Sequence, residues 1–288
     1  MDTKLGMWII LVILASLVTY NLTRFFVKET INICLRYHIV RKNLQKKPLP
    51  QIGGFAIALT ALFYLFALHN GFQWVSAMAV KSEVQLLTQV LIISILGYGF
   101  LGLFEDVGGK LDLIKGANQH LAHLRNGYLS ATLVRQTFGC FLALFISSFL
   151  ANETLLWIFG AIIIVLYTNI FHLLRDQPTA TGKLFLMHHF VFFFVFPLKE
   201  IWILAIPIIV AVLTYIPFEA KQKMNIGNIG TAIQGSLCAI YWNFSVPNIT
   251  YLGIITSCLI ITFLLLKRNF LLTNPTKNTV KETKATIQ

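Results

Sequence analysis

Long apolar segments separated by short polar breaks constrain this chain more than any other feature of its sequence. A bilayer core about 30 Å thick needs about 20 apolar residues per helix, and the chain supplies such segments repeatedly. Because 57% of its 288 residues are hydrophobic and only 12% are charged, the composition is not that of a soluble domain. We therefore predict an all-α, polytopic membrane bundle of about nine to ten transmembrane helices. The predicted segments are 7–27, 52–69, 85–104, 133–150, 155–174, 184–197, 200–217, 229–244 and 249–267.

The basic residues predict the orientation of these helices. Placing the N-terminus outside puts twenty of the 23 lysines and arginines in or beside cytoplasmic connections, as the positive-inside rule expects. The tryptophans then fall near the outer interface, where an indole is favoured. These residues are Trp8, Trp74, Trp157, Trp202 and Trp242. The C-terminus is therefore predicted to be cytoplasmic.

The two ends of the chain differ in character. Residues 7–27 follow a single lysine and a single aspartate and are longer than the apolar region of most signal peptides, so we interpret them as a membrane anchor. Residues 268–288 are polar, which predicts a disordered cytoplasmic tail after a single membrane domain of residues 1–267. The net charge of +12 suits anionic headgroups or phosphorylated ligands, whereas no compact basic domain supports nucleic-acid binding.

Some motifs are excluded by their context. "GYGFLG" at 97–102 matches a dinucleotide-binding pattern, but it lies within an apolar segment, where small residues for helix packing are the better interpretation. The histidine pairs have no third metal ligand at a recognisable spacing, so we interpret them as interfacial or packing residues. The pairs are His120 with His123 and His188 with His189. The cysteines show no paired spacing either, which argues against disulfides or a zinc site.

Four stretches on the predicted cytoplasmic side resemble one family of enzymes. They are "KKPLPQIGG" at 46–54, "LGLFEDVGG" at 101–109, "YTNIFHLLRDQPTATGKLF" at 167–185 and "NIGNIGTAIQG" at 225–235. In this order the chain resembles the polyprenyl-phosphate sugar-1-phosphate transferases, glycosyltransferase family 4, which includes the phospho-MurNAc-pentapeptide translocase and the undecaprenyl-phosphate GlcNAc-1-phosphate transferase. The resemblance covers nearly the whole chain.

The resemblance implies a plasma-membrane enzyme of cell-envelope polysaccharide synthesis. Such an enzyme attaches a sugar 1-phosphate from a UDP-sugar to a prenyl phosphate and releases UMP. It requires Mg²⁺, because a hard cation held by carboxylates offsets the repulsion between two phosphates. The resemblance also leaves room for a homo-oligomer or a partner membrane protein.

This chain departs from the family at its acidic positions. The family's aspartate pair is Glu105 and Asp106, with Asp106 as the candidate metal ligand. A later family aspartate falls on Arg175 if Lys183 is held in register, with Asp176 one residue away. Asn228 stands where the family has a third aspartate. Replacing aspartate by arginine and by asparagine changes the local charge by +2 and +1, which disfavours a divalent cation and favours a phosphate.

The sequence leaves three functions open. We rank first a catalytically silent relative that binds a lipid phosphate or a partner enzyme, and second an active transferase with an unorthodox site. A transporter or channel ranks third, because few charges lie within the apolar segments. The candidate catalytic residues are Glu105, Asp106 and Asp176. The candidate binding residues are Lys46, Lys47, Gln51, Asn169, Arg175, Gly227, Asn228 and Gly230. Each candidate binding residue also has a structural interpretation. The basic residues can anchor the helices at the membrane surface, the glycines can form turns and Asn228 can cap a helix.

Overall fold

The computed structural model describes residues 3–42, 48–74, 82–108, 125–127, 129–195, 199–246 and 248–273. Within these residues each of the nine predicted apolar segments corresponds to one helix, except that residues 52, 53 and 174 lie just outside the helices. The helices are α1 (Thr3–Arg36), α2 (Gly54–Trp74), α3 (Ser82–Gly108), α5 (Ala131–Leu150), α6 (Thr154–Leu173), α7 (Ala180–Val195), α8 (Lys199–Ala220), α9 (Gly227–Ser245) and α10 (Ile249–Thr273). Two short antiparallel strands, β1 (Val40–Lys42) and β2 (Pro48–Pro50), follow α1.

Seven of the described helices are long and apolar enough to cross a membrane. Helix α7 is shorter, and α9 is not among the seven. The prediction of a helical, multi-pass membrane bundle is therefore confirmed. The number of crossings and their orientation stay predictions.

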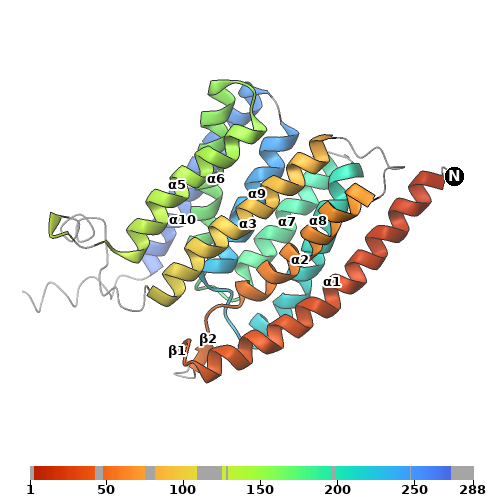
Figure 1. The fold of residues 1–288 in the computed structure, drawn as a ribbon. Coiled ribbons are helices and arrows are strands. Elements are labelled where there is room, and N and C mark those ends of the chain that lie inside the picture. The colour runs from red at the N-terminus through yellow and green to blue at the C-terminus, as the bar shows by residue number, and fades with distance from the viewer. Residues whose placement is uncertain are drawn as a thin grey trace, which may run out of the picture.

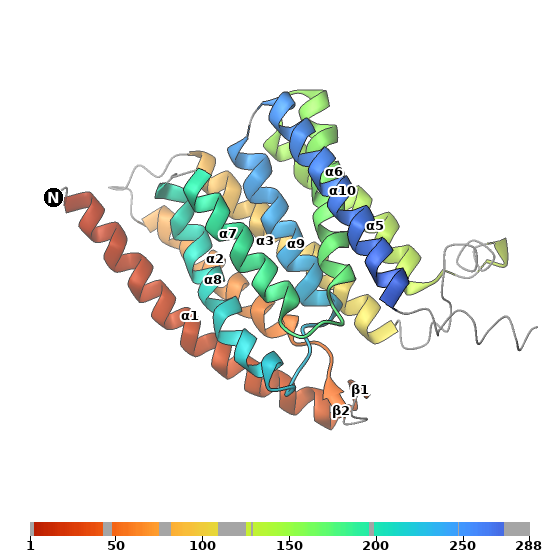
Figure 2. The same ribbon diagram turned by 180° about the vertical axis from the view of Figure 1, so that it is seen from behind.

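Successive helices run in alternate directions, so α1 begins and α10 ends at opposite ends of the bundle (Figures 1 and 2). Helix α1 covers one flank, whereas α5, α6 and α10 form the other. Helix α9 lies between them and contacts α2, α3, α5, α6 and α7. Nearly all of its residues are buried, including the polar Gln234, Ser236 and Asn243. The core of the bundle is thus built around a helix that carries polar side chains.

Glycines bring the central helices into close contact. A Cβ atom added to Gly102 on α3 would lie 2.5 Å from Cα of Ile229 on α9, and one added to Gly235 would lie 2.7 Å from Cα of Thr168 on α6. Gly97 packs directly against Leu142. The prediction that residues 97–102 serve helix packing is therefore confirmed.

The outer surfaces of the bundle are strongly apolar. Phe138, Phe141 and Phe145 on α5 are all more than half exposed, as is Leu17 on α1. In a membrane, lipid tails cover such side chains, because hydrocarbon is as apolar as the residues themselves.

Two helices are longer than the apolar segments that predicted them. Helix α1 continues nine residues beyond position 27, and its 34 residues span about 51 Å at 1.5 Å per residue. Helix α10 continues to Thr273, so the first six residues of the predicted 268–288 tail are helical. The rest of that tail lies outside the described residues.

Candidate functional site

Two of the family-like motifs meet at the end of the bundle where α3 and α6 end and α9 begins, which we call the site end. The backbone N–H of Asn225 donates to the carbonyl oxygen of Pro50 at 2.8 Å, and that of Gly53 donates to the carbonyl oxygen of Asn225 at 2.9 Å. Gly227 has a φ of +70°, and any side chain there would collide with the backbone oxygen of Gln51. Glycine is therefore required at this position, both by its conformation and by the close approach of the two loops.

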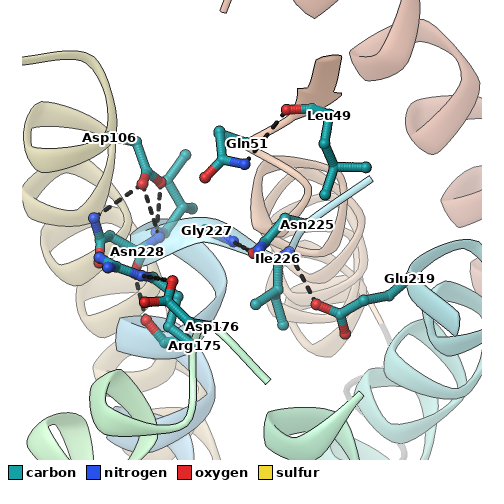
Figure 3. Close-up of polar contacts among 12 residues, drawn as sticks. Leu49, Gln51, Asp106, Arg175, Asp176, Glu219, Asn225, Ile226, Gly227 and Asn228 are labelled. Atoms are coloured by element: carbon teal, nitrogen blue, oxygen red, sulfur yellow. Dashed lines mark hydrogen bonds and ion pairs between the residues drawn. The ribbon is translucent and has the colours of Figure 1, made fainter. Parts of the chain in front are cut away.

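Asp106, at the end of α3, holds the beginning of α9 (Figure 3). Its Oδ1 accepts hydrogen bonds from the backbone N–H of Asn228 at 3.0 Å and from the Asn228 side-chain amide at 2.9 Å, and its Oδ2 accepts from the backbone N–H of Ile229 at 3.2 Å. The first N–H groups of a helix have no partner within the helix and carry partial positive charge, so a carboxylate is a favourable acceptor for them. The candidate metal ligand thus serves as a helix cap in this structure.

Asn228 connects Asp106 to Arg175. The side-chain oxygen of Asn228 accepts a hydrogen bond of 2.6 Å from a terminal guanidinium nitrogen of Arg175. Since an aspartate carboxylate can only accept and a guanidinium can only donate, an amide between them satisfies both partners. The sequence motifs predict that Glu105, Asp106, Arg175 and Asn228 converge on one cytoplasm-facing cleft. Asp106 and Arg175 do meet at Asn228, but Glu105 pairs with a different residue. Asp106 and Asn228 are buried and form a closed network rather than the walls of an open cleft.

Arg175 also forms an ion pair with its neighbour, with 3.2 Å between its Nε and Oδ1 of Asp176. Its side chain keeps 21% of its exposure, and that of Asp176 keeps 51%. Burial alone would lower the pKa of Arg175, but nearby carboxylates, above all Asp176, raise it beyond its ordinary value. The guanidinium is therefore charged at any physiological pH, and it is Arg175, not Asp176, whose side chain reaches Asn228.

Glu105 turns away from Asp106 and pairs with a residue that the sequence did not single out. Its Oε2 lies 2.7 Å from Nε of Arg135 on α5, and both side chains are 7% exposed. This contact is an ion pair without hydrogen-bond geometry. The hydroxyl of Thr132 donates to the other oxygen of Glu105 at 3.3 Å. Consecutive helical residues point about 100° apart, which explains why the two acids face different helices.

These contacts leave the acidic residues poorly placed for magnesium. Mg²⁺ needs several oxygen ligands around one point, whereas the oxygens of Asp106 accept three hydrogen bonds and Glu105 is paired with Arg135. Among the described residues, Glu105, Asp106 and Asp176 do not gather into a metal-binding group. The donor set at the site end therefore does not fit the ion that the family resemblance implies.

The other candidate binding residues have structural contacts. Asn169 accepts a hydrogen bond from Gln136 at 2.9 Å, and the Gln51 amide donates to the carbonyl oxygen of Leu49 at 3.3 Å. Gly230 packs directly against the backbone of Gly54. Lys46 and Lys47, like His120 and His123, lie outside the described residues.

A buried glutamate joins three segments at the site end. Glu219 on α8 is 3% exposed and accepts hydrogen bonds from the backbone N–H of Thr179 at 3.1 Å and of Ile226 at 3.2 Å. Glu219 lies two residues beyond the predicted segment 200–217, and Arg135 lies near the start of segment 133–150. Both are buried near the ends of helices long enough to span a membrane, so these charges lie at the edge of the apolar segments rather than in their middle. An acidic residue at the end of so apolar a segment is the signal that could have found Glu219.

Replacing Glu219 with glutamine is expected to lower the free energy of unfolding by about 1–2 kcal/mol. Glutamine has one acceptor oxygen instead of two, so it can accept from the N–H of Thr179 or of Ile226 but not from both, and the remaining hydrogen bond is no longer strengthened by a negative charge. Chemical unfolding in mixed micelles measures this change. Glu153, which is exposed at the start of α6, gives the matched control, and its replacement with glutamine should have almost no effect. Equal losses from the two variants would contradict the role of Glu219.

Comparisons with known proteins do not assign the chain to a family. No family model matches the chain, and no curated protein matches it. The resemblance to the prenyl-phosphate transferases therefore rests on the four sequence motifs and stays a prediction.

Proposed function

We propose that the protein binds a prenyl phosphate lipid at the site end, on the cytoplasmic face of the plasma membrane, without metal-dependent turnover. The observation that carries this proposal is the hydrogen bonding of Asp106 to the beginning of α9. A carboxylate that caps a helix is not available to hold Mg²⁺ between two phosphates. A transferase of the family type depends on that ion, whereas a binder does not.

Arg175 is the residue that would contact the phosphate. A guanidinium has five N–H donors, and the hydrogen bonds to Asp176 and Asn228 use two of them. The remaining three have no partner among the described residues, and the side chain is partly exposed. Arginine forms charge-assisted, bidentate hydrogen bonds with phosphate oxygens, which supplies directly the attraction that a metal ion would otherwise provide.

The position of Arg175 also suits a lipid rather than a free phosphate. It lies two residues beyond the end of α6, a helix long and apolar enough to cross the bilayer. The headgroup of a prenyl phosphate is at the membrane surface while its chain is among the acyl tails, so the lipid presents its phosphate at this depth. The apolar helix surfaces below provide contact for the chain.

Replacing Arg175 with alanine is expected to weaken prenyl phosphate binding about 10- to 100-fold, because hydrogen bonds to a charged group contribute about 1.5–3 kcal/mol. Binding is measured by titrating prenyl phosphate into the full-length protein in nanodiscs, with and without EDTA. The wild-type affinity should be the same in both conditions. Lys221→Ala is the matched control, since it removes one exposed basic residue near the site end and should change the affinity little.

Two further measurements distinguish lipid binding from the binding of free phosphate and from transferase activity. Inorganic phosphate should bind much more weakly than prenyl phosphate, because it lacks the apolar chain. Incubation with a UDP-sugar, prenyl phosphate and Mg²⁺ should release no UMP. UMP release that requires Mg²⁺ and is abolished by Asp106→Asn would instead support an active transferase, and loss of lipid binding in EDTA would refute the metal-free proposal.

A further inference from the structure

A second cluster of chemically active side chains lies in the interior of the bundle. His188 and His189 on α7 and Cys238 on α9 are all buried. Their potential ligand atoms lie within 4.8 Å of one another, and the two helices run side by side (Figure 2). Among the described residues this is the one group of three or more histidine, cysteine or acidic side chains that could hold a metal ion. We propose that it is a buried binding site for monovalent copper, Cu⁺.

The hydrogen bonding of the imidazoles supports a metal ligand set. The Nδ1 atom of His189 lies 2.8 Å from the backbone oxygen of Phe185. Since a carbonyl oxygen can only accept, this nitrogen carries the proton and Nε2 has a bare lone pair. Nε2 has no hydrogen-bond partner, although it is fully enclosed. Metal-binding histidines show this arrangement, in which one nitrogen donates to a backbone carbonyl and the other binds the metal.

His188 provides a second, independent observation. Neither of its ring nitrogens has a hydrogen-bond partner, and the residue is 8% exposed. Buried polar atoms without partners are rare and unfavourable, and they are more so in a membrane, where water does not replace the missing partner. Aromatic rings of Tyr167, Phe192 and Tyr241 pack around the pair. A cation bound between the histidine nitrogens and the cysteine sulfur would give these buried nitrogens a partner.

The charge and number of the ligands favour Cu⁺ over Zn²⁺. Cysteine binds metals as the thiolate and histidine as the neutral imidazole, so the three ligands carry a total charge of −1. With Cu⁺ the site is neutral, whereas Zn²⁺ would leave an uncompensated positive charge in a low-dielectric interior, which is unfavourable. Zinc also requires a fourth ligand to complete its tetrahedron. A soft thiolate with two imidazoles is a ligand set that suits monovalent copper.

The side chains need only a small adjustment to bind the ion. Bond lengths of about 2.0 Å to nitrogen and 2.3 Å to sulfur place the ligand atoms of a trigonal site about 3.5–4 Å apart, compared with the 4.8 Å limit within which they lie here. Small rotations about the side-chain bonds cover the difference. Bound copper would link α7 directly to α9.

The copper site is separate from the proposed lipid-phosphate site. Cys238 lies ten residues after Asn228 on the same helix, which corresponds to about 15 Å along the helix axis. The two proposals therefore stand or fall independently. The sequence did not reveal the copper site because its third ligand is about fifty residues away from the histidine pair and only the packing of α7 on α9 brings them together.

Competition with a chromogenic Cu⁺ chelator tests the proposal. The full-length protein in nanodiscs, kept reduced and free of oxygen, is titrated with the copper complex of bicinchoninate, and the loss of its absorbance reports transfer to the protein. The wild type is expected to take one Cu⁺ per chain. Cys238→Ser and His189→Gln should each weaken binding by about 100-fold or more, since changes even outside the ligand shell weaken metal sites by about 10- to 100-fold. Cys258→Ser, which changes an exposed cysteine on α10, should leave the affinity unchanged.

The remaining measurements define what would overturn the proposal. X-ray absorption of the copper-loaded protein should show one sulfur and two nitrogen neighbours, and copper should raise the melting temperature of the wild type but not of His189→Gln. A wild type that takes no stoichiometric copper, or a folded Cys238→Ser variant that binds it as tightly, would show that the histidines serve packing alone. Equal affinity for Zn²⁺ would refute the assignment to a monovalent ion. If Cys238→Ser does not fold, the comparison of His189→Gln with Cys258→Ser decides the same question.

Discussion

Replacing Arg135 with methionine is expected to destabilise the bundle by about 3–5 kcal/mol, the largest effect of any single substitution considered. The change leaves Glu105 as a buried carboxylate without its partner, and removing one member of a buried ion pair is strongly unfavourable because the other charge stays desolvated. Methionine keeps most of the volume and the flexibility of the arginine stem, so that loss of packing contributes little. The free energy of unfolding in mixed micelles measures the effect.

A double-mutant cycle isolates the pair. Glu105→Gln alone should also destabilise the protein, because it leaves the Arg135 guanidinium uncompensated, whereas the double variant should regain most of the loss. Lys183→Met, which removes an exposed charge on α7, is the matched control and should change stability by less than about 0.5 kcal/mol. Strictly additive losses in the double variant would show that the two side chains do not interact.

Replacing Asp106 with alanine is expected to lower the free energy of unfolding by about 2–4 kcal/mol. Three donors lose their acceptor, namely the backbone N–H groups of Asn228 and Ile229 and the side-chain amide of Asn228. A buried donor without a partner costs about 1–3 kcal/mol, and a lost helix cap costs about 1 kcal/mol. Asp176→Ala removes an equal charge from an exposed position and should have a small effect in the same unfolding measurement.

Asp106→Asn distinguishes the structural role of this carboxylate from a catalytic one. Asparagine keeps the size and one acceptor oxygen, so about half of the lost stability should return. If the site binds lipid phosphate through Arg175, this variant should bind prenyl phosphate at least as tightly as the wild type, because one negative charge has been removed from beside Asn228. A folded Asp106→Asn variant that no longer binds the lipid would contradict this account.

The apolar segments predicted the helices well because a membrane helix needs only length and hydrophobicity. Helix ends were predicted less well. Arg24, Lys28 and Arg36 lie on α1 beyond or near the predicted end of its apolar segment, since lysine and arginine are good helix formers and nothing in the sequence breaks the helix there. Hydrophobicity marks where a helix leaves the bilayer, not where the helix itself ends.

Some of the contacts at the site end were predictable from the sequence motifs rather than from hydrophobicity. The family resemblance predicted that Glu105, Asp106, Arg175 and Asn228 converge. Asn228 contacts both Asp106 and Arg175, whereas Glu105 pairs with Arg135 instead. The partners of the acids were not predictable. Arg135 lies thirty residues from Glu105, and it looked like one of many basic residues beside a helix end. The ion pair of Glu105 and Arg135 depends on which face of α5 packs against α3. A single sequence does not determine how one helix is rotated relative to its neighbour.

The burial of α9 has a consequence for how the protein is made. This helix is enclosed by five others and carries Gln234, Ser236 and Asn243 in its interior-facing positions, so by composition it is a weak candidate to enter lipid alone. Two of these side chains have partners on neighbouring helices, since Ser94 of α3 donates to Ser236 and the Asn243 amide donates to the carbonyl oxygen of Gly160 on α6. Insertion of α9 must therefore accompany or follow assembly of the helices around it, and a chain truncated before α9 would leave an unfilled centre in an otherwise inserted protein.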